Sequence, residues 1–147
     1  MTRINLIKPQ WLLDQHLMAE YRELPMVMAS LRRSLKSKNG LVIPPTYRMN
    51  SGHVPFFYDK KDFLMMRWEV LIKELRRRKF LISPENRIVD FTVFDNVECV
   101  EWKPNMKDML INLDRILLRV SEKPDFYLYK GKGMTYKTYC TKILERI

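Results

Sequence analysis

Apolar residues recur with a helical period in three stretches, at about Leu12 to Ser37, Lys61 to Lys79 and Asn105 to Glu122. In the first stretch the apolar positions fall within an arc of roughly 80° at about 100° per residue. The apolar positions of the three stretches are, in order, Leu13, Leu17, Tyr21, Leu24, Met28, Leu31 and Leu35; Leu64, Trp68, Leu71, Ile72 and Leu75; and Met106, Met109, Leu110, Leu113, Ile116, Leu117 and Val120. The pattern predicts three amphipathic helices, each with one buried face.

Prolines, glycines and cations mark the limits of these helices. Pro25 lies inside the first pattern, where it removes one backbone hydrogen bond and is expected to kink the helix. The pair Asn39-Gly40 is typical of a helix C-terminus. Pro124 follows the end of the third stretch, and the second stretch ends in a run of basic residues that suits the helix dipole.

The segments between the helices have patterns of their own. Residues 41–60 hold three prolines and an aromatic triplet. Residues 83–104 alternate well enough to predict a hairpin turning at Asp95-Asn96, with a loop as the open alternative. The tail from Pro124 is aromatic and basic. We therefore expect an all-α fold: a single compact domain, residues 1–147, of three main helices with long loops and an aromatic C-terminal tail.

Composition adds a packed core and a basic charge to this prediction. Hydrophobic residues make up 46% of the chain, enough for a core, yet no apolar run is long enough for a membrane span or a signal peptide. We expect no membrane association. Cys99 and Cys140 lack the spacing of metal ligands, so reduced cysteines, no metal and no cofactor are expected. The net charge of +10 favours nucleic acid as partner, and a basic but uninvolved surface is the alternative.

The first helix carries a candidate catalytic carboxylate. His16 and Glu23 are two helical turns apart and within about 20° of each other, on the border of the apolar arc, whereas Arg22 points further out. A carboxylate at such a border can be partly desolvated and still reach a ligand, which suits acid–base chemistry. Pairing of Glu23 with a neighbouring cation is the structural alternative, and the spacing alone leaves both open.

The third helix and the tail carry candidate nucleic-acid contacts. Arg115 and Arg119 are four residues apart, nearly opposite the apolar arc and beside Asn112, which predicts an exposed ridge able to hold two phosphates. Ordinary solvated charge is the alternative. The aromatic residues of the tail alternate with basic ones, as in a surface on which bases stack, or they belong to the core. These aromatic residues include Phe126, Tyr127, Tyr129 and Tyr136.

Three blocks of the sequence, MTRINL, DQHLMAEYRELP and GHVPFFYDKKDFL, closely resemble the phage-type pyrimidine-dimer DNA glycosylase family, the dimer-specific endonuclease V. The resemblance covers most of the chain and is weakest at residues 83–103. It implies a small all-α repair enzyme for UV-induced cyclobutane pyrimidine dimers in double-stranded DNA. Such an enzyme removes the base and then nicks the abasic site, so it is both an N-glycosylase and an abasic-site lyase. The resemblance also implies a monomer that prefers damaged DNA, in the cytoplasm of a bacterium or a phage-infected cell.

The resemblance assigns roles to individual residues. It makes the α-amine of Thr2 the nucleophile and Glu23 the essential carboxylate. An α-amine has a pKa near 8, so roughly 10% of it is uncharged at pH 7, against about 0.04% of an ordinary lysine. The remaining assignments are active-site support by Arg3, Gln15, His16 and Arg22; phosphate binding by Arg115, Arg119 and Lys132; and lesion or base contacts by Phe126, Tyr127 and Tyr129.

Two departures from the family pattern concern lesion specificity. Met26 stands where the family commonly has arginine, and Arg32, Arg33 and Arg48 are the candidates to replace that cation. The family's Trp-Tyr-Lys-Tyr-Tyr tail motif is here Phe-Tyr-Leu-Tyr-Lys, at residues 126–130. The alternatives are therefore the same chemistry on another damaged or modified base, or a non-catalytic DNA-binding relative.

The nucleophile also sets a condition on processing. While Met1 is attached, Thr2 has no free amine, and the chain cannot react by this route. The predicted chemistry therefore requires removal of Met1, which the small residue Thr2 permits.

Overall fold

The computed structural model describes residues 3–146 and is mostly helical. The helices are α1 (Asp14–Leu35), α2 (His53–Phe56), α3 (Lys61–Arg77), α4 (Met106–Glu122) and α5 (Tyr136–Leu144). Short 3-10 turns lie at Pro9–Trp11, Phe57–Asp59, Pro84–Asn86 and Phe91–Asn96. The all-α prediction is confirmed, and the three long helices lie within a few residues of their predicted limits. Pro25 lies inside α1 and does not end it.

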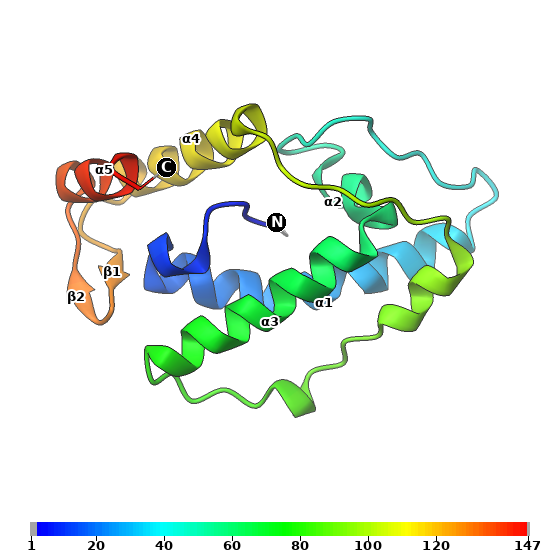
Figure 1. Ribbon diagram of the computed structural model, residues 1–147, viewed down its shortest axis with the longest axis horizontal. Coiled ribbons are helices and arrows are strands. Elements are labelled where there is room, and N and C mark those ends of the chain that lie inside the picture. Colours follow the sequence, from blue (N-terminus) through cyan, green and yellow to red (C-terminus); the bar gives the residue numbers. More distant parts are fainter. Residues whose placement is uncertain (1–2, 147) are drawn as a thin grey trace.

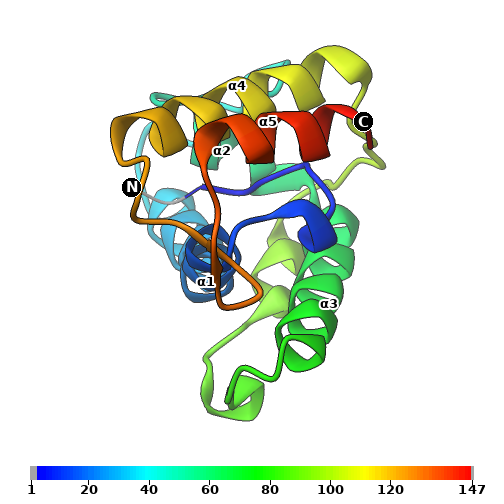
Figure 2. The ribbon, with the colours of Figure 1, turned by 90° about the vertical axis from the view of Figure 1, so that its left-hand side faces the viewer.

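The N-terminal segment, residues 3–8, runs between two layers of helices. In Figures 1 and 2, α4 and α5 lie above this segment, and α1 and α3 lie below it. The aliphatic residues of the segment are buried, with Ile4 and Ile7 fully so. Residues 4–7 are therefore part of the core.

An aromatic cluster fills the space beside this segment. Tyr47, from the loop before α2, packs edge-on against His53, Phe56 and Phe57, with ring centroids 5.4 to 6.1 Å apart. Trp102, from the segment before α4, packs against Phe56 with ring centroids 5.0 Å apart. These contacts fix α2 against the N-terminal segment, and they bring His53 next to it.

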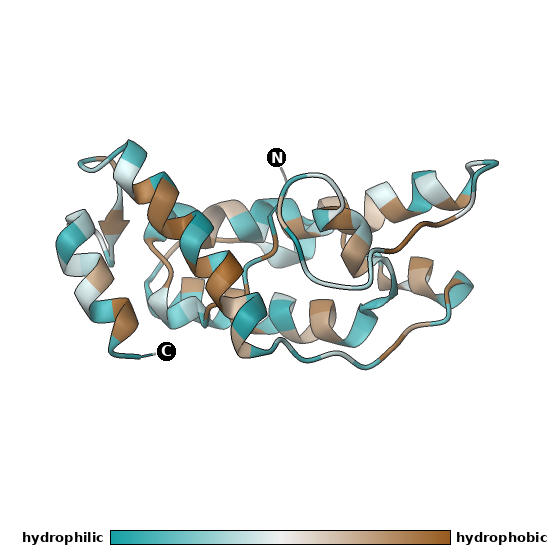
Figure 3. Ribbon diagram, turned by 90° about the horizontal axis from the view of Figure 1, so that it is seen from above, coloured by the Kyte–Doolittle hydropathy of each residue, from teal (hydrophilic) through white to brown (hydrophobic). Residues whose placement is uncertain are grey.

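The start of α4 was predicted correctly, and its buried face only in part: Leu113, Ile116 and Val120 are buried as expected. Asn105 and Asp108 form a capping box, in which each side chain accepts a hydrogen bond from the other residue's backbone N–H. Met106 and Leu110 were expected inside, yet they are 57% and 44% exposed, whereas Asn112 is fully buried. The inward face is thus rotated by roughly 70° from the apolar arc. Figure 3, seen from above, shows hydrophobic and hydrophilic positions intermixed along this helix.

The predicted hairpin between residues 83 and 104 is wrong. This segment forms two 3-10 turns, and Asp95-Asn96 ends the second. The side chain of Asp90 accepts a hydrogen bond from the Thr92 N–H and so starts this turn. Val93 and Phe94 are consecutive and both buried, which a strand with alternating faces does not allow.

The tail contains structure that was not predicted. β1 (Leu128–Tyr129) pairs antiparallel with β2 (Lys132–Gly133). Lys130 and Gly131 make the turn, with φ of 51° and 80°, the positive values of a two-residue type I′ hairpin. The helix α5 follows, and the hydroxyl of Thr135 caps it by accepting from the Thr138 N–H. No helix among residues 3–146 is long and apolar enough to cross a membrane.

Candidate active site

A small pocket lies where the N-terminal segment meets α1. It is lined by Arg3, Asn5, His16, Ala19, Glu20 and Glu23. The carboxylate of Glu23 accepts a hydrogen bond from the backbone N–H of Arg3, with Oε2 and N 3.1 Å apart. The structure therefore brings together Arg3, His16 and Glu23, three of the residues predicted for the site. The predicted nucleophile Thr2 lies outside the described residues.

Glu20 lines the same pocket but is fully engaged in the protein interior. Arg67 of α3 donates to it twice, from Nε at 2.6 Å and from Nη2 at 2.9 Å, and Asn5 donates from Nδ2 at 2.8 Å. The side chains of Glu20 and Arg67 are 0% and 4% exposed. This bidentate ion pair is structural, and it leaves Glu23 as the pocket carboxylate that can face a substrate.

Positive charge from two elements converges on the pocket. Burial, and then the charges of Arg115 and Arg119 on α4, lower the pKa of Arg3 below its usual value. Burial, and then Arg3 and Arg119, lower the pKa of His16 to about 4. His16 is thus neutral at neutral pH, and its Nδ1 is buried with no hydrogen-bond partner among residues 3–146. A pocket of this kind favours an anionic ligand.

The predicted ridge on α4 needs one correction. Arg115 and Arg119 lie at the edge of the inward face, where Arg115 donates to Asn50 Oδ1 and Arg119 pairs with Glu122. Asn112, predicted beside them on the surface, is instead buried. Its Oδ1 accepts from the N–H groups of residues 6 and 7 at 2.7 and 3.1 Å, because this stretch of backbone has no strand partner.

Gln15 connects the pocket to the tail. Its Nε2 donates to the carbonyl of Phe126 at 2.8 Å, and its Oε1 accepts from the Leu128 N–H at 2.9 Å. These bonds hold Tyr127 against His16, with ring centroids 4.7 Å apart. Phe126 is 54% exposed and packs edge-on against Tyr127. Gln15 therefore supports the site by anchoring an aromatic pair at its rim.

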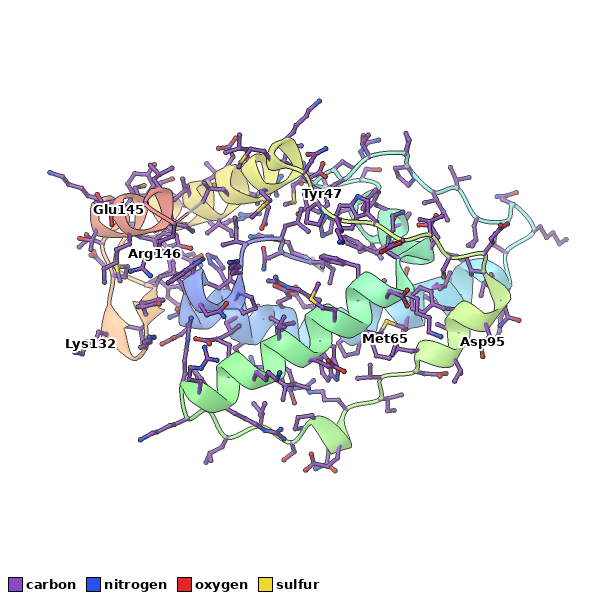
Figure 4. The ribbon with its side chains drawn as sticks, in the orientation of Figure 1. Tyr47, Met65, Asp95, Lys132, Glu145 and Arg146 are labelled. Carbon is purple, nitrogen blue, oxygen red and sulfur yellow. The ribbon has the colours of Figure 1, made fainter. Side chains whose placement is uncertain are left out.

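The other two predicted tail residues lie elsewhere. The hydroxyl of Tyr129 donates to the carbonyl of Gln10, and Cζ of Arg78 lies 4.9 Å from the centroid of its ring. Tyr129 therefore packs the hairpin against the 3-10 turn at Pro9–Trp11. Lys132 lies at the outer end of the hairpin in Figure 4, far from Tyr47, whose hydroxyl binds the N-terminal segment. The structure does not bring Tyr129 or Lys132 to the pocket.

Arg22 points away from the pocket, toward a second cavity on the other side of α1. This cavity is lined by Met18, Tyr21, Arg22, Leu81, Ile82, Ser83, Asn86 and Arg87. Arg87 lies over the ring of Tyr21, 4.9 Å from its centroid. Two arginines and no carboxylate line the cavity, so it too favours an anionic group. Sequence reasoning missed Arg87, because no local pattern links it to Arg22.

Three cations, Arg32, Arg33 and Arg48, were predicted to replace the arginine expected at position 26, and one of them is engaged elsewhere. Met26 is 52% exposed. Arg32 forms an ion pair with Asp90, so it is not available as a replacement. Arg87, from the segment after α3, supplies a cation beside Arg22 instead.

Fold and site together define a small helical protein in which Arg3 and Asn5 line a pocket with Glu23 as its accessible carboxylate, under positive charge from Arg3 and from α4. This arrangement is suited to DNA phosphates and sugar chemistry. A sequence model of the family described as pyrimidine dimer DNA glycosylase matches residues 1–87. The chain belongs to this family, whose members are DNA repair glycosylases that act on DNA. The match contains every residue that lines the pocket, whereas α4 and the tail lie beyond it.

Proposed function

We propose that this chain removes the base at cyclobutane pyrimidine dimers in double-stranded DNA and then cleaves the abasic strand. The α-amine of Thr2 attacks C1′ of the sugar, and the bond from C1′ to the base breaks with its electrons leaving on the base, which is protonated. The amine then loses its protons as the sugar ring opens to an imine. Glu23 accepts the C2′ proton, and the C3′–O bond breaks to release the 3′ phosphate by β-elimination.

The observation that carries this proposal is the hydrogen bond from the Arg3 N–H to Glu23. The α-amine of residue 2 is separated from that nitrogen by one residue's backbone, a distance under about 4 Å. Glu23 is therefore within reach of both the attacking amine and the cation that the attack creates. One carboxylate can act on both.

The arginines around the pocket support the same chemistry in two ways. They offer binding groups for the phosphates on either side of a lesion, the role proposed for Arg3, Arg115 and Arg119, and Arg22 is proposed to do the same from the second cavity on the other side of α1. Positive charge also disfavours protonation of a nearby amine, as it does for His16. Phe126 and Tyr127 would contact bases at the rim.

The test is borohydride trapping of the protein, with Met1 removed, on a duplex that contains one defined cyclobutane dimer. We expect a covalent adduct whose sugar remnant maps by mass spectrometry to Thr2. The matched control is the same chain with Met1 retained, which should bind the duplex and form no adduct. A remnant on a lysine such as Lys132 would show that the N-terminal mechanism is wrong.

A second candidate keeps this chemistry and changes the lesion. The observation that favours it is the exposed Met26, one turn after Arg22, where the family commonly has arginine. A direct comparison of dimer-containing duplexes with duplexes that carry other damaged bases separates the two candidates. Preferential trapping on another lesion would favour the second.

A further inference from the structure

The backbone of the N-terminal segment is held by side chains instead of by a neighbouring strand. Side chains of α1, α2, α3, α4 and the loop before α2 each bind it. The bonds are Arg3 N to Glu23 Oε2, Ile4 N to His53 Nε2, Tyr47 Oη to the Ile4 carbonyl, Leu6 N and Ile7 N to Asn112 Oδ1, and Arg67 Nη1 to the Ile7 carbonyl. The position of residues 3–7 therefore depends on individual side chains.

His53 makes the bond nearest to the pocket after that of Glu23. Its ring is 1% exposed and joins two backbone groups: Nε2 is 2.8 Å from the Ile4 nitrogen, and Nδ1 is 2.8 Å from the Arg48 carbonyl oxygen. Because the Ile4 N–H donates, Nε2 must be the unprotonated acceptor, and Nδ1 carries the proton donated to Arg48. Burial lowers the pKa of His53 to about 4, consistent with this neutral form at neutral pH.

The ring of His53 has little freedom to move. Tyr47 and Phe57 pack edge-on against it, with centroids 5.4 and 5.5 Å away. The imidazole thus holds Ile4 from a site fixed by the aromatic cluster. Without it, the chain end before Asn5 would be held by Glu23 and by the hydroxyl of Tyr47.

We propose that His53 is a positioning residue for the N-terminal amine, one that fixes Ile4 so that the amine of residue 2 is presented beside Glu23. This inference rests on the proposed function. His53 does not touch the reacting atoms, and it acts through the backbone of residues 3 and 4. Its contribution is orientation: an attacking group misplaced by about 1 Å can react about a hundredfold more slowly.

The test compares two substitutions that differ in their ability to accept a hydrogen bond. His53→Leu fills similar space and removes the acceptor, whereas His53→Gln can place its amide oxygen near the position of Nε2. Phe56→Leu is the matched control, because Phe56 packs in the same cluster, is 1% exposed and makes no bond to the segment through its side chain. For each, the single-turnover rate of trapped-adduct formation is measured on a preformed abasic duplex. Affinity is measured on a duplex with a tetrahydrofuran abasic analogue.

For His53→Leu we expect the trapping rate to fall by at least about tenfold while affinity for the analogue duplex stays within about threefold. His53→Gln and Phe56→Leu should retain trapping rates within about threefold of the parent. Equal losses in His53→Leu and Phe56→Leu would mean that general loosening of the cluster is responsible, and they would overturn the inference. A His53→Leu rate within threefold of the parent would overturn it as well.

Amide hydrogen exchange of Ile4 gives a readout that does not depend on activity. The Ile4 amide should be protected in the parent and in His53→Gln, and should exchange at least about tenfold faster in His53→Leu. Absence of any trapped adduct in the parent would refute the proposed function, whereas unchanged exchange in His53→Leu would refute the positioning role. If His53→Leu does not fold, Tyr47→Phe removes the other bond to Ile4. That variant is then expected to slow trapping, and an unchanged rate would count against the inference.

Discussion

Glu20 and Glu23 lie one helical turn apart on α1, and their surroundings give them different roles. Glu20 is fully buried and receives three hydrogen bonds from Arg67 and Asn5. Glu23 is half-buried at the pocket and receives a hydrogen bond from the backbone of Arg3. The first arrangement stabilises the fold, and the second leaves a carboxylate able to accept a proton. The same substitution should therefore affect activity at Glu23 and stability at Glu20.

Glu23→Gln should abolish strand cleavage and spare most of the DNA affinity. The amide can still accept the Arg3 N–H bond, but it cannot take up a proton or stabilise a cation, so we expect cleavage to fall at least about a hundredfold. Cleavage of dimer-containing DNA and affinity for an abasic-analogue duplex are measured together. Glu145→Gln, at the exposed end of α5, is the control. Nicking by Glu23→Gln at close to the parental rate would remove Glu23 from the mechanism.

Glu20→Gln should act on stability. It leaves the buried guanidinium of Arg67 without its counter-charge, and breaking a buried pair in this way costs about 3 kcal/mol. Urea unfolding followed by tryptophan fluorescence measures the change in the free energy of unfolding. Glu69→Gln, on the exposed face of α3, should change it by less than about 0.5 kcal/mol. Equal values for the two variants would contradict a structural role for the Glu20–Arg67 pair.

The sequence predicts individual residues only where a local pattern or a family motif marks them. Glu23 could be predicted as a site residue because it lies on the border of the apolar arc and resembles the family's carboxylate. Asn112 and His53 could not be identified in this way, because their roles depend on where the N-terminal segment docks. That docking joins residues about fifty and a hundred positions apart, which helical periodicity does not encode.

At the scale of elements, α4 shows how a polar residue can decide which face of a helix is buried. The apolar period alone would turn Met106 and Leu110 inward. Instead, Asn112 enters the core, because the unpaired N–H groups of residues 6 and 7 need an acceptor and burial without one is costly. This rotation also carries Arg115 and Arg119 to the edge that faces the pocket.

Arg115→Ala and Arg119→Ala should weaken binding to damaged and undamaged duplexes alike. Each should lower the slope of log affinity against log salt by about one, because each would release about one counterion fewer. Lys107→Ala is the matched control, since Lys107 is exposed near the start of the same helix, about 80° and 120° around it from Arg115 and Arg119. Binding titrations between low and moderate salt measure the slopes. Unchanged affinity and slope in both arginine variants would mean that the two arginines do not bind DNA and are ordinary solvated charges.

The elements that were not predicted have no long hydrophobic period in their own sequence. The segment from 83 to 104 alternates like a hairpin, but Val93 and Phe94 are both drawn into the core, and the Asp90 cap favours a turn. The hairpin and α5 of the tail are short, and tertiary bonds hold them. The Asp14 carboxylate accepts from the N–H groups of Lys130 and Gly131, and the Tyr139 hydroxyl donates to the Trp11 carbonyl. Such bonds join the two ends of the chain.

At the scale of the whole molecule, an excess of positive charge surrounds a core that contains both histidines. The chain has two histidines, and both are buried where arginines lie close by. His16 and His53 each have a pKa lowered to about 4, first by burial; Arg3 lowers both pKa values further. The same arrangement that prepares the pocket for an anion therefore keeps both imidazoles neutral.

This arrangement predicts that acidification destabilises the fold before the carboxylates titrate. In the unfolded chain both histidines bind a proton near pH 6.5, whereas in the folded chain they do so only near pH 4. Between these values the unfolded state binds more protons, so the free energy of unfolding falls as pH decreases, by at most about 1.4 kcal/mol per pH unit for each histidine. Urea unfolding at intervals from pH 7 to pH 5 measures this slope. His53→Gln should reduce it by about half, and His16→Gln combined with His53→Gln should nearly remove it, because no other side chain has an ordinary pKa in this range. If the stability of the parent chain does not change from pH 7 to pH 5, the imidazoles are not held neutral by burial. If the double variant keeps the full slope, other groups cause the pH dependence.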